Sequence, residues 1–177
     1  DRGGLVSVNN GSPIAHVAYV WYAEGIKQLS SDINLVELFP WAYRKMVLQQ
    51  QIMSISSLAD FPPEADVDRR THEAIGTKSI LTVPLMIGQR VHHLLALHAV
   101  QQERAWPAEV VAQIRLIGEI FVSALQRREA EFVLKDANDR LELAARSAGC
   151  GMWELNLDTG ALWATGMSLD HFGFAPD

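Results

Sequence analysis

The sequence predicts an α+β fold built on an antiparallel sheet, followed by one long helix and a short, incomplete hairpin. Three observations support this prediction. Several strand-like stretches are joined by short turns, helical segments lie between some of them, and a helical pattern runs from residue 107 to about residue 146. Strands joined mostly by hairpins, with helices inserted between them, are typical of antiparallel and not of parallel α+β domains.

The composition is that of a folded protein. The chain has 177 residues, of which 49% are hydrophobic and 20% charged, so we expect one domain, or one domain and part of another. The net charge of −6 and the absence of a dense Lys/Arg cluster argue against nucleic-acid binding. We expect no membrane segment, and the single cysteine, Cys150, fits a reducing, cytoplasmic location.

The first two strands are expected at residues 5–8 and 14–23, joined by the turn residues 9–13. Asn and Gly tolerate positive φ, and Pro fixes the exit from the turn. In the second strand Tyr19 and Trp21 share a face, because side chains alternate along a strand. A hairpin is therefore predicted.

The middle of the chain alternates between helical and extended segments. We expect a polar connection at 25–37, a helix at 40–50, a weakly hydrophobic edge strand at 52–57 and a charged helix at 64–75. His72 is one of the inner positions of the charged helix, and Gly76 ends it. Residues 79–86 and 90–100 are rich in Ile, Leu and Val and form a second predicted hairpin.

The long helix carries a thin apolar stripe with a charged interruption near Arg128. At about 1.5 Å per residue it is about 60 Å long, so its second half must leave the core of a small domain. Such a helix usually forms a two-helix coiled coil, and we expect a homodimer through it. The predicted dimer and signalling residues are Ile114, Ile117, Phe121, Leu125, Leu134, Ala137 and Leu141.

A third, short hairpin is expected at 152–157 and 161–164, followed by a helical turn at 168–172. These residues are too few to bury a stable core by themselves. We therefore expect the opening of a further domain, and interpret the chain as a piece of a longer protein.

Four sequence blocks, in family order, resemble the GAF domains of bacterial sensor proteins: residues 38–41, 57–62, 76–85 and 104–107. The resemblance covers residues 1–126, without the helix that normally precedes the first strand. Residues 143–154, with the turn at 158–160, resemble the start of a PAS domain, which would extend over 143–177 and be truncated. Residues 127–142 would be a helical linker continuing the last GAF helix.

This order of domains implies a regulatory sensory input module of a two-component sensor histidine kinase. Ligand or partner state would be relayed through the dimeric signalling helix. One alternative attaches the same module to a cyclic-di-nucleotide cyclase or phosphodiesterase, or to a transcription activator. Another is a stand-alone small-molecule enzyme on the GAF scaffold. The phosphotransfer regions of a kinase are absent from this sequence.

The sequence offers no catalytic site and no metal site, and we expect no cofactor. Its glycines form no phosphate-binding loop, and its six histidines are interpreted as ordinary strand and helix residues. A carboxylate-rich stretch with interleaved arginines is interpreted as a solvated helix face. It comprises Asp60, Glu64, Asp66, Asp68 and Glu73.

The remaining candidates for function are aromatic. If the helix at 40–50 covers the sheet, as it does in the family that the sequence resembles, five rings could line a pocket for a planar small-molecule ligand. The alternative is a filled core. The candidate ligand-binding residues are Tyr19, Trp21, Phe39, Trp41 and Tyr43.

Overall fold

The computed structural model describes residues 1–9 and 11–173. The chain divides into two compact units, Asp1–Ala124 and Leu125–Asp177. Helix α4 (Ala108–Ser147) contributes residues to both. Within the described residues, no helix combines the length and the apolar character needed to cross a lipid bilayer.

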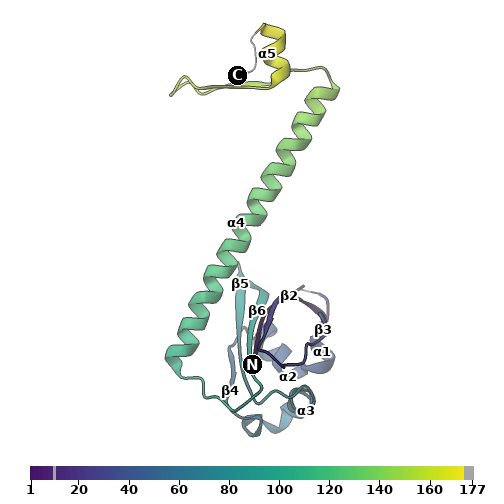
Figure 1. Ribbon diagram of the computed structural model, residues 1–177, viewed down its shortest axis with the longest axis vertical. Coiled ribbons are helices and arrows are strands. Elements are labelled where there is room, and N and C mark those ends of the chain that lie inside the picture. Colours follow the sequence, from purple (N-terminus) through teal and green to yellow (C-terminus); the bar gives the residue numbers. More distant parts are fainter. Residues whose placement is uncertain (10, 174–177) are drawn as a thin grey trace. The chain divides into compact units, whose positions relative to one another are not determined.

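The first unit contains a six-stranded sheet in which neighbouring strands are antiparallel (Figure 1). The strand order is β3-β2-β1-β6-β5-β4, so β1 and β6, far apart in sequence, pair at the centre. The predicted antiparallel α+β fold is confirmed. The strands are β1 (Arg2–Val8), β2 (Ile14–Tyr22), β3 (Asp32–Asn34), β4 (Met53–Ile55), β5 (Ser79–Ile87) and β6 (Arg90–Ala99).

Short helices cover one face of this sheet, and the first part of α4 packs on the other. The covering elements are α1 (Leu35–Leu38), α2 (Pro40–Tyr43), a π-helical turn (Arg44–Leu48), two 3₁₀ turns (Leu58–Asp60 and Pro63–Ala65) and α3 (Asp66–Ala74). On the opposite face Gly118 of α4 lies so close to Leu85 that a Cβ added there would be 2.4 Å from Leu85 Cδ2.

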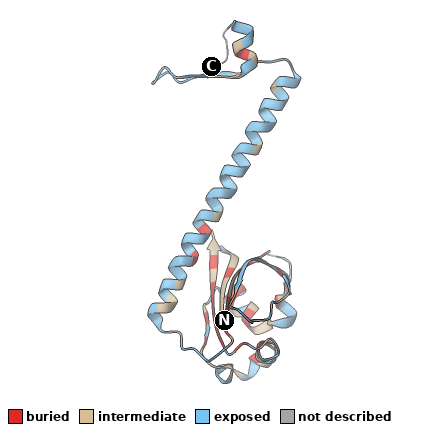
Figure 2. Cartoon of the chain, viewed as in Figure 1, coloured by how far each residue is buried: buried red, intermediate tan, exposed pale blue. Residues whose placement is uncertain are grey.

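Side-chain alternation divides the central strands between these two layers. Thr82 of β5 pairs with Ala96 of β6 and faces the short helices, whereas Leu85, three residues along β5, faces α4. Buried residues concentrate in the first unit (Figure 2). The layer under the short helices includes Val6, Leu35, Met46, Met53, Ile80 and Leu94.

Both predicted hairpins of the first unit are present. β1 pairs with β2, and β5 pairs with β6 through a turn in which Gly88 has φ of 62°. The edge position of β4 is also as predicted. Asn10, part of the first predicted turn, lies outside the described residues.

Two segments differ from the sequence-based expectation. The segment expected to be a polar connection at 25–37 contains β3, which adds to the start of β2. It also contains the start of α1, which Asn34 caps by accepting a hydrogen bond from the Glu37 amide at 3.1 Å. Three residues are too few to show strand periodicity. The helix expected at 40–50 is α2 followed by the π-helical turn, so its hydrogen-bond pattern changes at Arg44.

The second unit contains the rest of α4, the strands β7 (Trp153–Leu155) and β8 (Leu162–Ala164), and α5 (Gly166–Phe172). The predicted hairpin is shorter than expected, and Trp153, Leu157 and Trp163 are exposed. Salt bridges four residues apart line this part of α4, and such pairs stabilise an exposed helix by about 0.2–0.5 kcal/mol each. They are Arg127–Glu131, Arg140–Asp136 and Arg146–Glu142.

Candidate functional site

A cavity of about 230 Å³ lies between the sheet and the short helices. Val6, Leu94 and Ala96 form its floor on β1 and β6, and Phe39 and Met46 contribute from the helical side. This volume is below the range of about 300–1,000 Å³ typical of pockets for drug-sized molecules. The apolar lining suits a small ligand with a largely apolar body.

His72 is a deeply buried polar group of the cavity wall. Its side chain is 3% exposed, and neither ring nitrogen has a hydrogen-bond partner among the described residues. The ring lies between Phe39, at a centroid distance of 4.7 Å, and Phe61, at 5.8 Å. Buried polar atoms are nearly always hydrogen-bonded, so this imidazole leaves a donor and an acceptor for an additional group.

His98 stands beside His72, with 5.4 Å between the ring centroids. Arg2 Nε donates a hydrogen bond to His98 Nδ1 at 3.2 Å, which requires Nδ1 to be unprotonated and puts the imidazole proton on Nε2. Part of the His98 side chain remains accessible, as expected for a residue that lines two cavities.

Both imidazoles are neutral at neutral pH. Burial, with a smaller contribution from the Arg2 charge, lowers the pKa of His72 from 6.5 to about 3. Burial also lowers the pKa of His98 well below 6.5, and His72 and Arg2 act in the same direction. Each ring can therefore donate one hydrogen bond and accept another.

Arg2 brings a positive charge next to His98. Its side chain is buried, and its guanidinium donates to His98, to the carbonyl oxygen of Ile75 at 3.2 Å and to Thr77 Oγ1 at 2.5 Å. Ile75 caps the C-terminus of α3, where a cation is favourable. Burial lowers the Arg2 pKa from its usual value, and Tyr22 opposes this effect.

A smaller cavity of about 60 Å³ adjoins the first. Arg2 and Tyr22 belong to its wall, and Val6, Ala96 and His98 line both cavities. The Tyr22 hydroxyl accepts a hydrogen bond from the Leu29 amide at 2.9 Å, which ties the loop between β2 and β3 to this wall. The site is therefore an apolar compartment beside a smaller one that holds a cation.

Asp68 fixes the helical side of the cavity. It is fully buried and accepts hydrogen bonds from the amides of Trp41, at 3.1 Å, and Ala42, at 2.8 Å, so a side chain of α3 caps the first turn of α2. Burial raises the Asp68 pKa, and these hydrogen bonds oppose the rise. The expectation that Asp68 belongs to a solvated face is wrong, because its helix turns this carboxylate inward.

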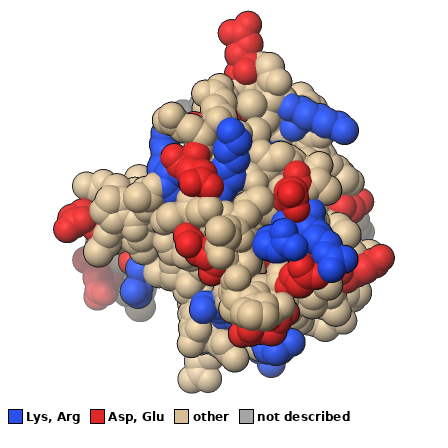
Figure 3. All heavy atoms as spheres, turned by 90° about the horizontal axis from the view of Figure 1, so that it is seen from below, with Lys and Arg blue, Asp and Glu red and all other residues tan. Residues whose placement is uncertain are grey.

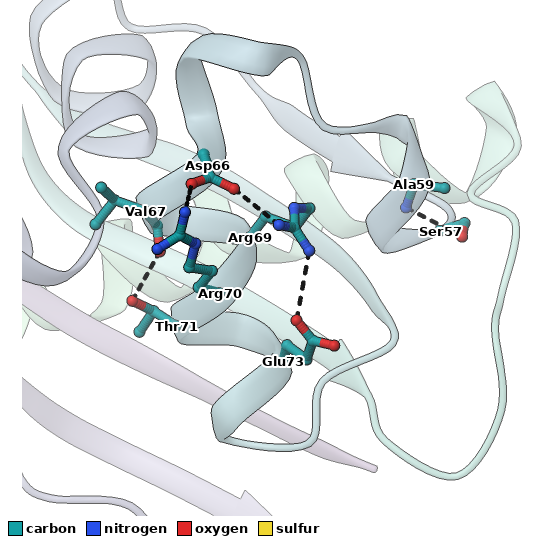
Figure 4. Close-up of polar contacts among 8 residues, drawn as sticks. All are labelled: Ser57, Ala59, Asp66, Val67, Arg69, Arg70, Thr71 and Glu73. Carbon is teal, nitrogen blue, oxygen red and sulfur yellow. Dashed lines mark hydrogen bonds and ion pairs between the residues drawn. The ribbon is translucent and has the colours of Figure 1, made fainter.

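The neighbouring charged side chains of α3 are at least partly exposed and pair with one another (Figure 4). Asp66 forms ion pairs with Arg69 and Arg70, and Arg69 also reaches Glu73 at 3.4 Å. The arginine hydrogen bonds lower the Asp66 pKa. This network stabilises the outer surface of α3 and contributes no group to the cavity.

The five candidate aromatic residues do not converge on the cavity. Phe39 lines it. Trp41 and Tyr43 are half-buried and pack against the core around it. Tyr19 and Trp21 are 54% and 63% exposed, and they pair with Leu5 and Gly3 on β1, which places them on the sheet face turned away from the cavity.

The predicted residues of the signalling helix follow the surface of α4. Ile114 and Leu125 are partly buried, and Ala137 is exposed. The others are exposed by 44 to 64% in this single chain: Ile117, Phe121, Leu134 and Leu141. They are available for contact with a second chain.

Sequence reasoning did not bring Arg2, His72 and His98 together. The inner position of His72 was predicted, but its neighbours depend on the pairing of β1 with β6, in which Arg2 lies opposite His98. No pattern within a single segment indicates that register. No group of three or more His, Cys, Asp and Glu residues in the described part of the chain could hold a metal ion.

Charges elsewhere on the surface are mixed. On the face drawn in Figure 3, acidic and basic side chains are interspersed, and neither sign forms a continuous area. A phosphate-binding surface would require a concentration of Lys and Arg. The cavity is thus the feature of this structure best suited to recognising a ligand.

Solved structures of GAF domains are similar to this chain. A phycocyanobilin-bound GAF domain of a cyanobacterial phytochrome has a TM-score of 0.63 and 17% identity, with 74% of this chain and 77% of that one covered. The blue-light absorbing PixJ GAF domain of Thermosynechococcus elongatus has a TM-score of 0.57 and 17% identity, with 75% of this chain and 80% of that one covered. The chain has a GAF fold.

A domain described as part of a two-component sensor histidine kinase of Sinorhizobium meliloti is similar as well, with a TM-score of 0.57, 12% identity, and coverage of 76% of this chain and 85% of that one. No protein-family model and no curated protein matches the sequence. The GAF fold therefore rests on the arrangement of strands and helices, and the chemistry of the cavity rests on this chain's own residues.

Proposed function

We propose that this chain is a sensory input module that binds a small molecule in the cavity between the GAF sheet and its short helices. The observation that carries the proposal is an apolar cavity that contains a buried imidazole, His72, without a hydrogen-bond partner among the described residues. The GAF domains named above include one that is bound to phycocyanobilin. A role in sensing agrees with these similarities.

The sheet offers a short route from the cavity to α4. Thr82 and Leu85 lie three residues apart on β5, one against the cavity and the other against Gly118 of α4. Close-packed layers transmit a displacement because they contain little free volume. Ligand occupancy would shift β5 and β6 and thereby change how α4 packs on the sheet.

We further propose that this module is joined to a second sensory domain and to an output domain. Residues 1–126 would be the GAF domain, 127–142 a coiled-coil linker, and 143–177 the beginning of a PAS domain. The exposed Trp153 and Trp163 agree with a hairpin that packs against further residues. The parent would be a bacterial sensor histidine kinase that receives the signal through a homodimer of α4.

Native mass spectrometry of the purified chain, alone and with a library of small molecules, tests ligand binding. The matched variant is Ala96→Phe, which fills a position lining both cavities, and its control is Ala18→Phe on the exposed part of β2. We expect bound ligands for wild type and Ala18→Phe, and loss of binding in Ala96→Phe. Equal binding by all three folded proteins would place the ligand elsewhere and refute the proposal.

Light scattering coupled to size-exclusion chromatography tests the dimer. Leu134→Glu and Leu141→Glu introduce charge into the apolar stripe, and Arg128→Glu changes a charged position in its interruption. We expect a dimer for wild type and Arg128→Glu, and a monomer when both leucines are replaced, because charges within a coiled-coil seam are destabilising. A wild-type monomer at all concentrations would contradict the relay.

A further inference from the structure

The guanidinium of Arg2 is a buried charge without a counter-ion. Its side chain is 5% exposed, and within residues 1–9 and 11–173 no carboxylate lies within ion-pair distance of it. The nearest acidic residue in sequence, Asp1, instead accepts a hydrogen bond from the Val100 amide at 3.2 Å and lies 3.7 Å from Arg104. An unpaired buried charge is costly, so this arrangement favours an anionic partner.

The hydrogen bonds of Arg2 leave capacity for that partner. A guanidinium has five N–H groups, and three of them are used by His98, Ile75 and Thr77. These three bonds hold the group in one orientation against β6 and the end of α3. One N–H group remains on each of Nη1 and Nη2, and these two donors equal in number the two oxygens of a carboxylate.

The cavity beside this charge and the larger cavity that adjoins it supply room for the partner. The smaller one, of about 60 Å³, is lined by Arg2, Tyr22 and His98 and exceeds the roughly 10–15 Å³ that a single water requires. The larger one adds an apolar volume of about 230 Å³ that contains the unpartnered His72. A molecule with one anionic end and a compact apolar body fits both compartments.

We propose that the ligand of this cavity is a small apolar carboxylate, whose carboxylate group is the counter-ion of Arg2 and whose hydrocarbon or aromatic body lies in the larger compartment beside His72. This inference rests on the proposed function, and it adds the chemical class of the ligand. His98 lies between the two compartments and presents a neutral ring to the ligand. A dianion is not expected, because Arg2 is the one cation among the described residues of the two cavity walls.

Isothermal titration calorimetry with matched pairs of probes tests the charge. The probes are benzoate, phenylacetate and hexanoate, each compared with its neutral primary amide, which has nearly the same shape. We expect wild type to bind at least one carboxylate about tenfold or more tightly than its amide, because charge-assisted hydrogen bonds are the stronger ones. Inorganic phosphate serves as a probe for anion binding that needs no apolar body, and we expect it not to bind.

The variants are Arg2→Met, Arg2→Lys and the control Arg104→Met, which removes an exposed arginine. Arg2→Met should lose the preference for the carboxylate, Arg2→Lys should keep part of it, and Arg104→Met should keep all of it. A purely structural role of Arg2 would weaken carboxylate and amide equally. Circular dichroism confirms that each variant is folded, and Arg2→Lys retains the cation if Arg2→Met does not fold.

Three results would overturn the carboxylate assignment. They are an amide that binds as tightly as its acid, a preference for the acid that persists in Arg2→Met, and no binding of any probe. If amides bind wild type but not Ala96→Phe, cavity binding and the proposed function stand while the charge assignment fails. Binding of phosphate alone would show an anion site independent of the apolar cavity.

Discussion

Stability should fall in mild acid because His72 is buried as a neutral imidazole. Its pKa is 6.5 in the unfolded chain and about 3 in the folded one, so between these values the unfolded state binds more protons. The neutral His72 makes its full contribution to stability above pH 6.5, and this contribution is lost as the pH falls toward 3. Between pH 7 and pH 5 the loss is about 2 kcal/mol, at about 1.36 kcal/mol per pKa unit. The loss at pH 5 depends little on the folded value, since pH 5 lies well above it.

Urea unfolding at pH 7 and pH 5 measures this loss, with His72→Phe and His72→Gln as variants that cannot titrate. Phenylalanine suits a position between Phe39 and Phe61, and glutamine keeps a polar group there. We expect wild type to lose about 2 kcal/mol more than either variant between the two pH values. His98 and Asp68 are present in all three proteins, and burial is the main cause of the shift in each pKa, so most of their contribution to the pH dependence cancels. An equal loss in wild type and variants would refute the assignment of a neutral, buried His72.

Three further predictions concern packing and capping, each measured by thermal or urea unfolding. Asp68→Ala should lower the free energy of unfolding by about 1–3 kcal/mol, because two amides of α2 lose their hydrogen-bond acceptor. Glu64→Ala is the exposed control, and an equal effect of both substitutions would contradict the capping role of Asp68. Gly118→Ala should lower the free energy of unfolding by about 1 kcal/mol, although alanine has the better helix propensity, because the added Cβ meets the buried Leu85. The double variant with Leu85→Ala should lose less stability than the sum of the two single variants, and strict additivity would argue against the contact. Leu81→Ala should cost about 2–5 kcal/mol, since Leu81 is fully buried; a loss below 1 kcal/mol would mean that this face is loosely packed.

Local patterns predicted the strands and helices that have enough residues to repeat. The β5 and β6 hairpin and the long helix α4 have clear periodicity and turn residues, and the structure contains both. β3, with three residues, has no such pattern and depends on pairing with β2. Asp68 was assigned to solvent because its neighbours in sequence are charged. In the structure it is buried and accepts its hydrogen bonds from two amides of α2, which lies far away in sequence.

The site depends on contacts that no short stretch of sequence encodes. Arg2 and His98 are 96 residues apart and meet because β1 pairs with β6. His72 comes from α3, in the layer of short helices, and reaches the ring of His98. Of the candidate rings, Phe39 reaches the cavity, whereas Tyr19 and Trp21 occupy the opposite sheet face. Alternation along a strand shows which side chains share a face, but it does not show which face lies against the cavity.

Disulfide crosslinking along α4 tests most directly whether the state of the cavity reaches the helix. Single cysteines are introduced at each position from 114 to 141 in a Cys150→Ser background, with and without Ala96→Phe to imitate an occupied cavity. We expect a crosslinking pattern with helical periodicity that contains Ile117, Phe121 and Leu134, and a change in that pattern when Ala96→Phe fills the cavity. An aperiodic pattern, or an identical one in both backgrounds, would contradict this expectation.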